Sequence, residues 1–307
     1  MQRVLPSGEI ASAAPQPIPR LRLPDRQSVF AQRADRLRQL SANSTMGGYL
    51  RLAAALADAQ HAALLSLPPG RPRFESIAVA HEHRMPVIPA AGADLPAHWP
   101  EVLMQMCAAA EIAPGVPPAV REVCARLRTR SPGELADAAD ALLAARVDRI
   151  DAAAAPFLMA ALQVCWVNIA RTLQVDDVPA LDVPGACPVC GSLPVASIVR
   201  TGKPYEGYRY LHCGLCATEW HMVRLKCSHC YAVEGVAFQL IEGGSQAVRA
   251  ETCEQCRTYR KILYQEKDGD VEPLADDLAS LSLDLLMSDA GYRRASANPL
   301  LWQPAEA

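Results

Sequence analysis

The chain has 307 residues, of which 50% are hydrophobic and 21% are charged, and its formal net charge is −3. This length suits about two or three domains, and the small net charge does not favour nucleic acid or an anionic membrane as a partner. The N-terminal segment has no apolar core of signal-peptide length, and no uninterrupted apolar run is long enough to span a bilayer. We therefore expect a cytoplasmic protein that does not insert into membranes and whose thiols are reduced.

The first half of the sequence predicts an arm followed by a helical domain. Residues 1–25 are rich in Pro, Ser and Ala and should form a flexible arm, whereas residues 26–183 should form the helical domain. Within that domain the Pro-rich stretch 66–98 is predicted to be mostly loop. Apolar periodicity and capping signals predict helices at 26–40, 48–65, 99–110, 118–130, 134–145 and 152–173.

Capping residues and hydrophobicity distinguish three of these predicted helices. Asp25 could cap the first helix, and Ser131 could cap the fifth in a capping box with Glu134. The last helix, 152–173, is the most hydrophobic, so we expect it at the centre of the domain.

Cysteines set the pattern of the second half of the chain. Eight of the eleven cysteines form four Cys-x-x-Cys pairs, and these pairs repeat with a period of 40 residues. Each repeat reads C-x2-C, 22 residues, C-x2-C, which supplies the four thiolates of one tetrahedral metal site. The candidate metal ligands are Cys187, Cys190, Cys213 and Cys216 in the first repeat, and Cys227, Cys230, Cys253 and Cys256 in the second.

Short predicted strands surround these cysteines. Val, Ile, Tyr and Thr are frequent in the runs that we expect to be strands, at 196–200, 208–212, 218–223, 236–241 and 258–264. We expect two small rubredoxin-like or zinc-ribbon β modules, at 184–226 and 227–268. Each repeat is too short to bury a large core, so the metal should contribute much of its folding energy.

A closing helix is predicted at 274–288, within the C-terminal region 269–307. Its leucines form one stripe that should dock on the helical domain or on the β modules: Leu274, Leu278, Leu281 and Leu285. The predicted fold class is therefore α+β, with an all-helical N-terminal domain, two β modules and a C-terminal helix.

The pairing of the cysteines has alternatives. Cys213, Cys216, Cys227 and Cys230 would also make a four-thiolate set by spacing, but the internal repeat favours one site per repeat. Four redox-active dithiols are disfavoured, because independent pairs have no reason to repeat and no βαβ pattern surrounds them. Iron and zinc both accept four thiolates in a tetrahedron, so the spacing does not choose between them.

The remaining cysteines and several histidines have ordinary interpretations. Three cysteines lie in apolar helix patterns and should be buried thiols: Cys107, Cys124 and Cys165. Histidines beside the cysteine turns should support the sites or lie on the surface: His212, His221 and His229. The sequence His81-Glu82-His83 lacks a downstream third ligand and should have a surface or packing role.

We find no supported catalytic combination, and four thiolates leave no coordination position for substrate, so we do not expect an enzyme.

The residues between the cysteines carry a more specific resemblance. They read CPVCG at 187–191, YLHCGLCATEW at 210–220, CSHC at 227–230, ETCEQC at 251–256, ADDLAS at 275–280 and GY at 291–292. With the helical half before them, these motifs resemble the formate dehydrogenase accessory protein (FdhE) family from about residue 20 to the C-terminus.

This resemblance implies a non-enzymatic assembly factor. Members of that family are cytosolic, bind iron in rubredoxin-like four-cysteine sites and act on the catalytic subunit of respiratory formate dehydrogenases. By resemblance, the eight cysteines would hold two metal ions, iron or alternatively zinc, and the chain would bind that catalytic subunit during its maturation. Self-association stays open.

The competing hypotheses are a rubredoxin-like one-electron transfer protein and a zinc-ribbon nucleic-acid protein. The near-neutral charge of 187–267 disfavours the nucleic-acid protein.

Overall fold

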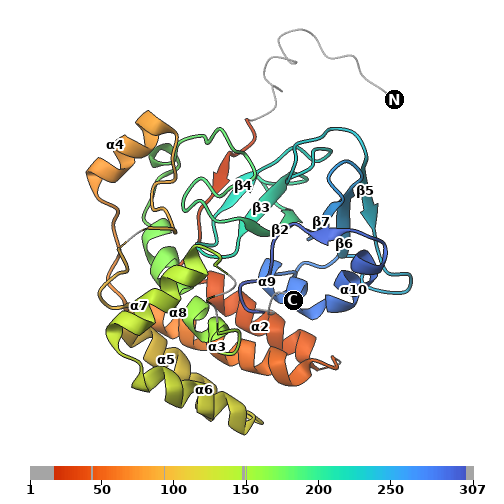
Figure 1. The fold of residues 1–307 in the computed structure, drawn as a ribbon. Coiled ribbons are helices and arrows are strands. Elements are labelled where there is room, and N and C mark those ends of the chain that lie inside the picture. Colours follow the sequence, from red (N-terminus) through yellow and green to blue (C-terminus); the bar gives the residue numbers. More distant parts are fainter. Residues whose placement is uncertain (1–16, 43, 93, 147–148, 150, 302–307) are drawn as a thin grey trace, which may run out of the picture.

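The computed structural model describes residues 17–42, 44–92, 94–146, 149 and 151–301. These residues form a helical half and a β half that lie side by side, which is the predicted mixed class (Figure 1). The helices of the first half are α2 (Val29–Ser41), α3 (Gly47–Ser66), α4 (Phe74–His83), α5 (Trp99–Ile112), α6 (Pro118–Thr129), α7 (Pro132–Leu143) and α8 (Ala155–Ala170).

Helix α8 is the centre of the helical half, as its composition predicts. Every residue of α8 except Ile169 is buried, and the helix contacts α3, α5 and α7. Its polar Gln163 is fully paired, because it accepts from Gln60 Nε2 at 2.7 Å and donates to the Gly214 carbonyl at 2.6 Å. Among the helices of the described residues, none combines the length and the apolar character that crossing a membrane requires.

The helix starts follow local capping chemistry. The capping box of α7 is present: Ser131 Oγ accepts from Glu134 N at 3.3 Å, and Glu134 Oε2 accepts from Ser131 N at 2.8 Å. Helix α2 begins at Val29 rather than at residue 26. Asp25 accepts from the Ser28 backbone N–H at 3.0 Å, so its side chain closes a turn before the helix instead of capping a helix that begins at the next residue.

The Pro-rich stretch 66–98 contains a helix that the sequence pattern did not reveal. Helix α4 is mostly exposed, and Ala80 is its one buried residue. A helix with so little buried surface shows no clear apolar stripe. The many prolines of the stretch 66–98 therefore predict a loop.

The predicted flexible arm is wrong for the part that the structure describes. Leu21–Arg22 forms strand β1, which pairs antiparallel with a strand of the first cysteine repeat. Arg20 donates to the carbonyls of Val175 and Val178 at 2.7 and 2.6 Å. Residues 1–16, which make up most of the predicted arm, lie outside the described residues.

The two cysteine repeats share one sheet. Beyond β1, its described strands are β2 (Pro194–Val199), β3 (Arg209–Cys213), β4 (Glu219–His221), β5 (Val236–Gln239), β6 (Val248–Cys253), β7 (Thr258–Tyr264) and β8 (Arg293–Arg294). Their order is β1-β4-β3-β2-β7-β6-β5, with β8 added beside β7. Within this sheet the parallel pair β2–β7 joins the first repeat to the second. The modules that we predicted as small separate units are therefore two parts of one continuous sheet.

The predicted C-terminal helix is two helices. Helix α9 (Pro273–Ala279) ends at Ser280, and α10 (Leu281–Asp289) begins directly after it. The single leucine stripe is therefore wrong beyond the break, since Leu285 is 69% exposed and α10 buries Leu283 and Met287 instead.

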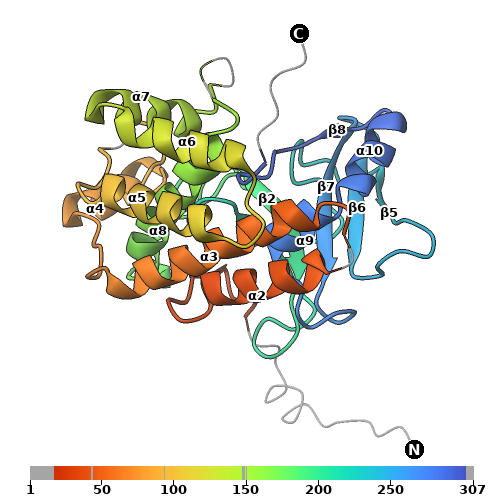
Figure 2. The same ribbon diagram turned by 90° about the horizontal axis from the view of Figure 1, so that it is seen from below.

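Helix α9 lies between the helical half and the sheet. Figure 2 shows it between α2 and α3 on one side and the strands on the other, and it contacts α2, α3 and β2. Arg33 Nε donates to Glu272 at 3.0 Å, and Arg36 Nη2 donates to Asp276 at 2.6 Å. These ion pairs hold α9 against α2, and α9 in turn packs on β2 of the sheet.

Two four-cysteine clusters as candidate metal sites

The structure brings the eight paired cysteines together as two groups of four, one group per repeat. Site 1 contains Cys187, Cys190, Cys213 and Cys216, and site 2 contains Cys227, Cys230, Cys253 and Cys256. Within each group, the four sulfur atoms lie within 4.8 Å of one another. The alternative grouping, which takes the middle two pairs as one set, does not occur.

The sulfur separations fit a tetrahedral ion. A metal–sulfur bond of about 2.3 Å places the corners of a tetrahedron about 3.8 Å apart. In site 1 the Cys187–Cys216 and Cys190–Cys213 sulfur pairs are 3.5 and 3.4 Å apart. In site 2 the equivalent sulfur pairs are 3.8 and 3.7 Å apart. Each group therefore already has nearly the size that a four-thiolate metal ion requires.

All four Cys-x-x-Cys turns have the same backbone geometry. The residue after the second cysteine has a positive φ in every turn: 78° at Gly191, 57° at Ala217, 64° at Tyr231 and 52° at Arg257. Only the first of these is glycine, which adopts this conformation without a steric penalty. The other three residues are held in the left-handed conformation by the turns, as expected where four sulfurs must converge on one point.

Hydrogen bonds to sulfur repeat with the sequence. Thr218 Oγ1 lies 3.3 Å from Cys216 Sγ, and Thr258 Oγ1 lies 3.0 Å from Cys256 Sγ, at the equivalent position 40 residues later. The backbone N–H of Cys216 also donates to Cys213 Sγ at 3.4 Å. The backbone N–H donor stabilises a thiolate that binds a metal, whereas the Cys216 thiol is itself the donor in its contact with Thr218. The two threonines were not among our predicted site residues, although their recurrence at the 40-residue period was available in the sequence.

Burial alone disfavours charge at site 1. All four cysteines of this site are buried, and burial raises the pKa values of the Cys187 and Cys216 thiols well above the ordinary value. Burial also raises the pKa of Cys190, but hydrogen bonds from the neighbouring thiols outweigh it and hold that pKa well below the ordinary value. A cation among the sulfurs would reverse this balance, because coordination deprotonates a thiol outright. The four-sulfur donor set and the short sulfur–sulfur distances fit a metal ion.

A buried carboxylate follows site 1 in the sequence. Glu219 is fully buried and accepts from Arg200 through both of its oxygens and from His212 Nδ1 at 3.0 Å. Burial raises the pKa of Glu219, but the charge of Arg200 and the hydrogen bond from His212 outweigh it and hold the pKa well below the usual range. His212 therefore supports a carboxylate and is not a fifth ligand.

Two buried arginines connect the repeats. Arg209 donates to Glu251 at 2.8 Å, and it also donates to the Lys226 carbonyl, directly before site 2, at 3.0 Å. Arg260 Nε donates to Ser228 Oγ at 2.9 Å, between the cysteines of the third turn, and Arg260 Nη1 donates to the Pro194 carbonyl of the first repeat. These pairs position site 2 relative to the first repeat, and spacing alone gave no signal for them because their partners are far apart in sequence.

The other candidate residues lie away from both clusters. The three remaining cysteines are buried in the helical half, as expected: Cys107, Cys124 and Cys165. His81 Nε2 contacts the Asp176 carbonyl at 3.0 Å on the surface, in agreement with a packing role.

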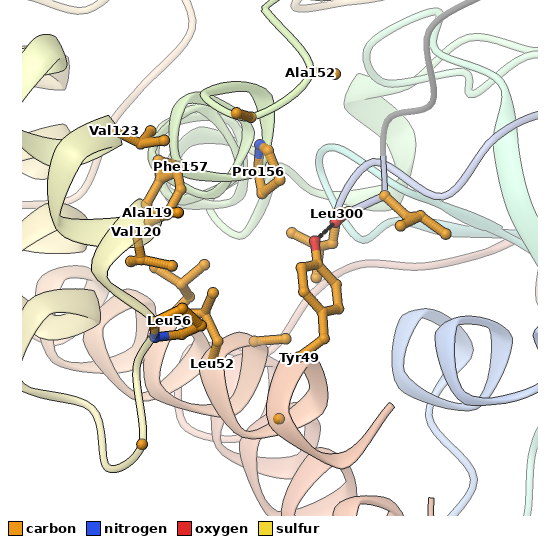
Figure 3. A pocket seen from close by; sticks show the side chains of 16 residues that line it. Tyr49, Leu52, Leu56, Ala119, Val120, Val123, Ala152, Pro156, Phe157 and Leu300 are labelled. Atoms are coloured by element: carbon orange, nitrogen blue, oxygen red, sulfur yellow. Dashed lines mark hydrogen bonds between the residues drawn. The ribbon is translucent and has the colours of Figure 1, made fainter. Parts of the chain in front are cut away.

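An apolar pocket of about 410 Å³ opens in the helical half, between α3, α6, the start of α8 and Leu300. Figure 3 shows Tyr49 pointing towards Leu300, to whose carbonyl its hydroxyl donates. Burial raises the pKa of Tyr49 to about 12, and Tyr49 is the one ionisable side chain among the described residues that line the pocket. The pocket suits an apolar group and offers no acid–base pair for a reaction.

Comparison with known proteins agrees with this architecture. Sequence profiles described as FdhE N-terminal, FdhE central domain and FdhE C-terminal domain match residues 18–182, 186–224 and 225–301. Protein FdhE of Escherichia coli K12 is 38% identical over 98% of this chain and 97% of its own length, and the FdhE homologue of Cronobacter sakazakii is also 38% identical over the same shares. The crystal structure of the FdhE protein from Pseudomonas aeruginosa superposes with a TM-score of 0.80 at 39% identity, covering 92% of this chain and 99% of the other. The chain belongs to the FdhE family.

Proposed function

We propose that this protein is an accessory factor for the maturation of a respiratory formate dehydrogenase, that it is not an enzyme, and that it binds the catalytic subunit of that dehydrogenase in the cytoplasm. Membership of the FdhE family supports this role. The four-thiolate clusters support a reducing compartment, because their cysteines must stay reduced to bind metal. The observation that carries the proposal is the convergence of the eight cysteines into two groups of tetrahedral size in a chain of this family.

We further propose that each cluster holds one metal ion, with iron as the first candidate and zinc as the alternative. The eight cysteines of sites 1 and 2 would be the ligands, and no other residue is needed to complete four-coordination. Iron in such a cage supplies one-electron redox chemistry, whereas zinc supplies structural support alone. In both cases the protein fixes the sulfurs through the four turns and excludes substrate from the metal.

The client-binding role can be tested by co-purification. The tagged chain is expressed in a host that lacks its own homologue, and formate dehydrogenase activity and the recovered catalytic subunit are both measured. Cys187→Ser should lower both, because it removes a ligand of site 1. Cys165→Ser is the matched control, since this buried thiol lies outside both sites and should leave both readouts near the wild-type level. Normal dehydrogenase activity in the host without any copy of the protein would refute the accessory role.

The second candidate function is one-electron transfer. It is favoured by one observation: Cys230 of site 2 is exposed, so an electron could pass between the site and a partner over a short distance. Voltammetry of the iron-loaded protein separates the two functions. Reversible reduction of one iron, together with dehydrogenase maturation that fails when reduction is blocked, supports electron transfer. Full maturation by the zinc-loaded protein excludes it as the required function.

A further inference from the structure

The two sites have the same donor set but very different surroundings. All four sulfur ligands of site 1 are buried. In site 2, Cys227 and Cys253 are buried, whereas Cys256 is partly exposed and Cys230 is exposed. The positions are equivalent in the repeat, since Cys230 corresponds to Cys190, so the difference comes from packing and not from ligand chemistry.

Both turns of site 1 are fastened by the helical half. In the first turn, the Val189 and Cys190 carbonyls accept from the backbone N–H groups of Ile88 and Ala90, each at 2.9 Å. In the second turn, the Gly214 carbonyl accepts from Gln163 Nε2 of α8 at 2.6 Å. The four cysteines also belong to the same apolar core as the residues of α5 and α8. Opening site 1 therefore requires separation of the sheet from the helices.

Site 2 lies towards the other end of the sheet. Its third turn leads into β5, the last strand in the sheet order, and its fourth turn joins β6 to β7. Contacts to these turns come from the C-terminal segment and from within the β half: Arg257 Nη2 donates to the Ala290 carbonyl at 3.0 Å, and Arg260 holds Ser228. None of these contacts has to break for solvent to reach Cys230.

Ligand exchange at a filled four-thiolate site begins with access. An incoming thiolate or nitrogen ligand forms a bond to the metal, the bond from the metal to one cysteine sulfur breaks, and that sulfur takes a proton from water. At site 2 this step can occur at Cys230 in the folded protein. At site 1 it must wait for an opening of the core, and openings of core regions are rare compared with those of surface segments.

We propose that the two sites differ in how readily they exchange a bound metal ion. Site 1 is a fixed structural centre, and site 2 is an exchangeable metal site at which Cys230 is the ligand displaced first by a small thiol or chelator. This inference rests on the proposed occupancy of both sites by metal. It assigns site 2 as the position at which the protein gains, loses or exchanges a metal ion without unfolding.

Metal release from the full chain tests the proposal. The protein is loaded with zinc, the metal content is measured, and release is followed with the chromogenic chelator 4-(2-pyridylazo)resorcinol. We expect one equivalent to leave at least about tenfold faster than the other, because only the slower one requires an opening of the core. In parallel, brief alkylation of the native protein with iodoacetamide and peptide mass spectrometry should find Cys230 modified before any cysteine of site 1.

Two serine variants at equivalent positions serve as the matched pair. Cys230→Ser should retain one zinc per chain and lose the fast phase, whereas Cys190→Ser should retain the fast phase if it folds. If Cys190→Ser does not fold, the alkylation order in the wild-type protein decides. Release of both ions at one rate, or alkylation at site 1 first, would overturn the proposal. A loading below one zinc per chain would instead refute metal occupancy itself, and the stoichiometry shows this before any kinetics are measured.

Discussion

Substitution of Glu219 by Gln should destabilise the protein strongly, because the carboxylate is the centre of a buried charge network. Glu219 is 0% exposed, and it pairs with Arg200 and His212 while Arg22 approaches it at 3.5 Å. The Gln amide keeps the shape but presents an NH₂ group to partners that are themselves donors, and it leaves the Arg200 charge buried without a counter-charge. Removal of one partner of a buried pair costs about 3–5 kcal/mol, so we expect a loss of this size in the free energy of unfolding.

The assay is urea unfolding of metal-loaded wild type and Glu219→Gln at neutral pH. Asp182→Asn is the matched control, since its ion pair with Arg84 is exposed (71% and 65%) and should contribute at most about 1 kcal/mol. The pH dependence has a defined sign. Because folding lowers the pKa of Glu219, its contribution is fully present above the unfolded value of about 4.3 and is lost as the pH falls towards the folded pKa. A loss below about 1 kcal/mol at neutral pH, or a difference that grows in acid, would show that the Glu219 carboxylate does not stabilise the fold through these charge pairs.

Three further substitutions test the sheet, the cysteine turns and the helices, each by the same unfolding assay. Arg209→Met removes the cation that is hydrogen-bonded to the buried Glu251, leaves Arg260 as a more distant counter-charge, and should cost about 3–5 kcal/mol; a loss within about 1 kcal/mol would show that the bridge between the repeats is not needed. Gly191→Ala should cost about 1–2 kcal/mol, because φ is +78° and the new Cβ would lie 3.1 Å from Pro86 Cγ. Ser131→Ala removes the capping box of α7 and should cost about 1 kcal/mol, and an unchanged unfolding midpoint would contradict that cap.

Local signals in the sequence predicted much of the helical half and the membership of the two clusters. The α7 capping box and the apolar character of α8 depend on residues close in sequence, and both appear as predicted. The 40-residue repeat was also sufficient to group the cysteines, because each set of four converges within its own repeat.

The features that the sequence did not predict depend on partners distant in the chain. Apolar and charged residues alternate in strand β6 from Val248 to Glu251, a pattern that would place Glu251 on a solvent-exposed face. Glu251 is nevertheless buried because Arg209, 42 residues earlier, neutralises it. The parallel pairing of β2 with β7 likewise joins segments that no local pattern connects, which is why two separate modules were expected instead of one sheet.

The break in the C-terminal helix has a similar cause. The leucine spacing is continuous through Ser280, but Ser280 Oγ donates to the Asp276 carbonyl at 2.6 Å and the Ser280 carbonyl accepts from the buried Lys261 at 3.1 Å. The Ser280 carbonyl therefore accepts from Lys261, whereas in a continuous helix it would accept from a backbone N–H of the next turn. Nothing in the periodicity of the leucines could show that a lysine from β7 would end α9 at this point.

The most direct test of the account is the metal content of the full chain, purified without oxygen and without an affinity-column metal, together with its optical spectrum. We expect two metal ions per chain, falling to one in Cys230→Ser. Charge-transfer bands that bleach on reduction would identify iron, and two zinc ions without visible absorption would make the sites structural. A folded chain with no bound metal and eight freely alkylated cysteines would contradict the central claim that these clusters are metal sites.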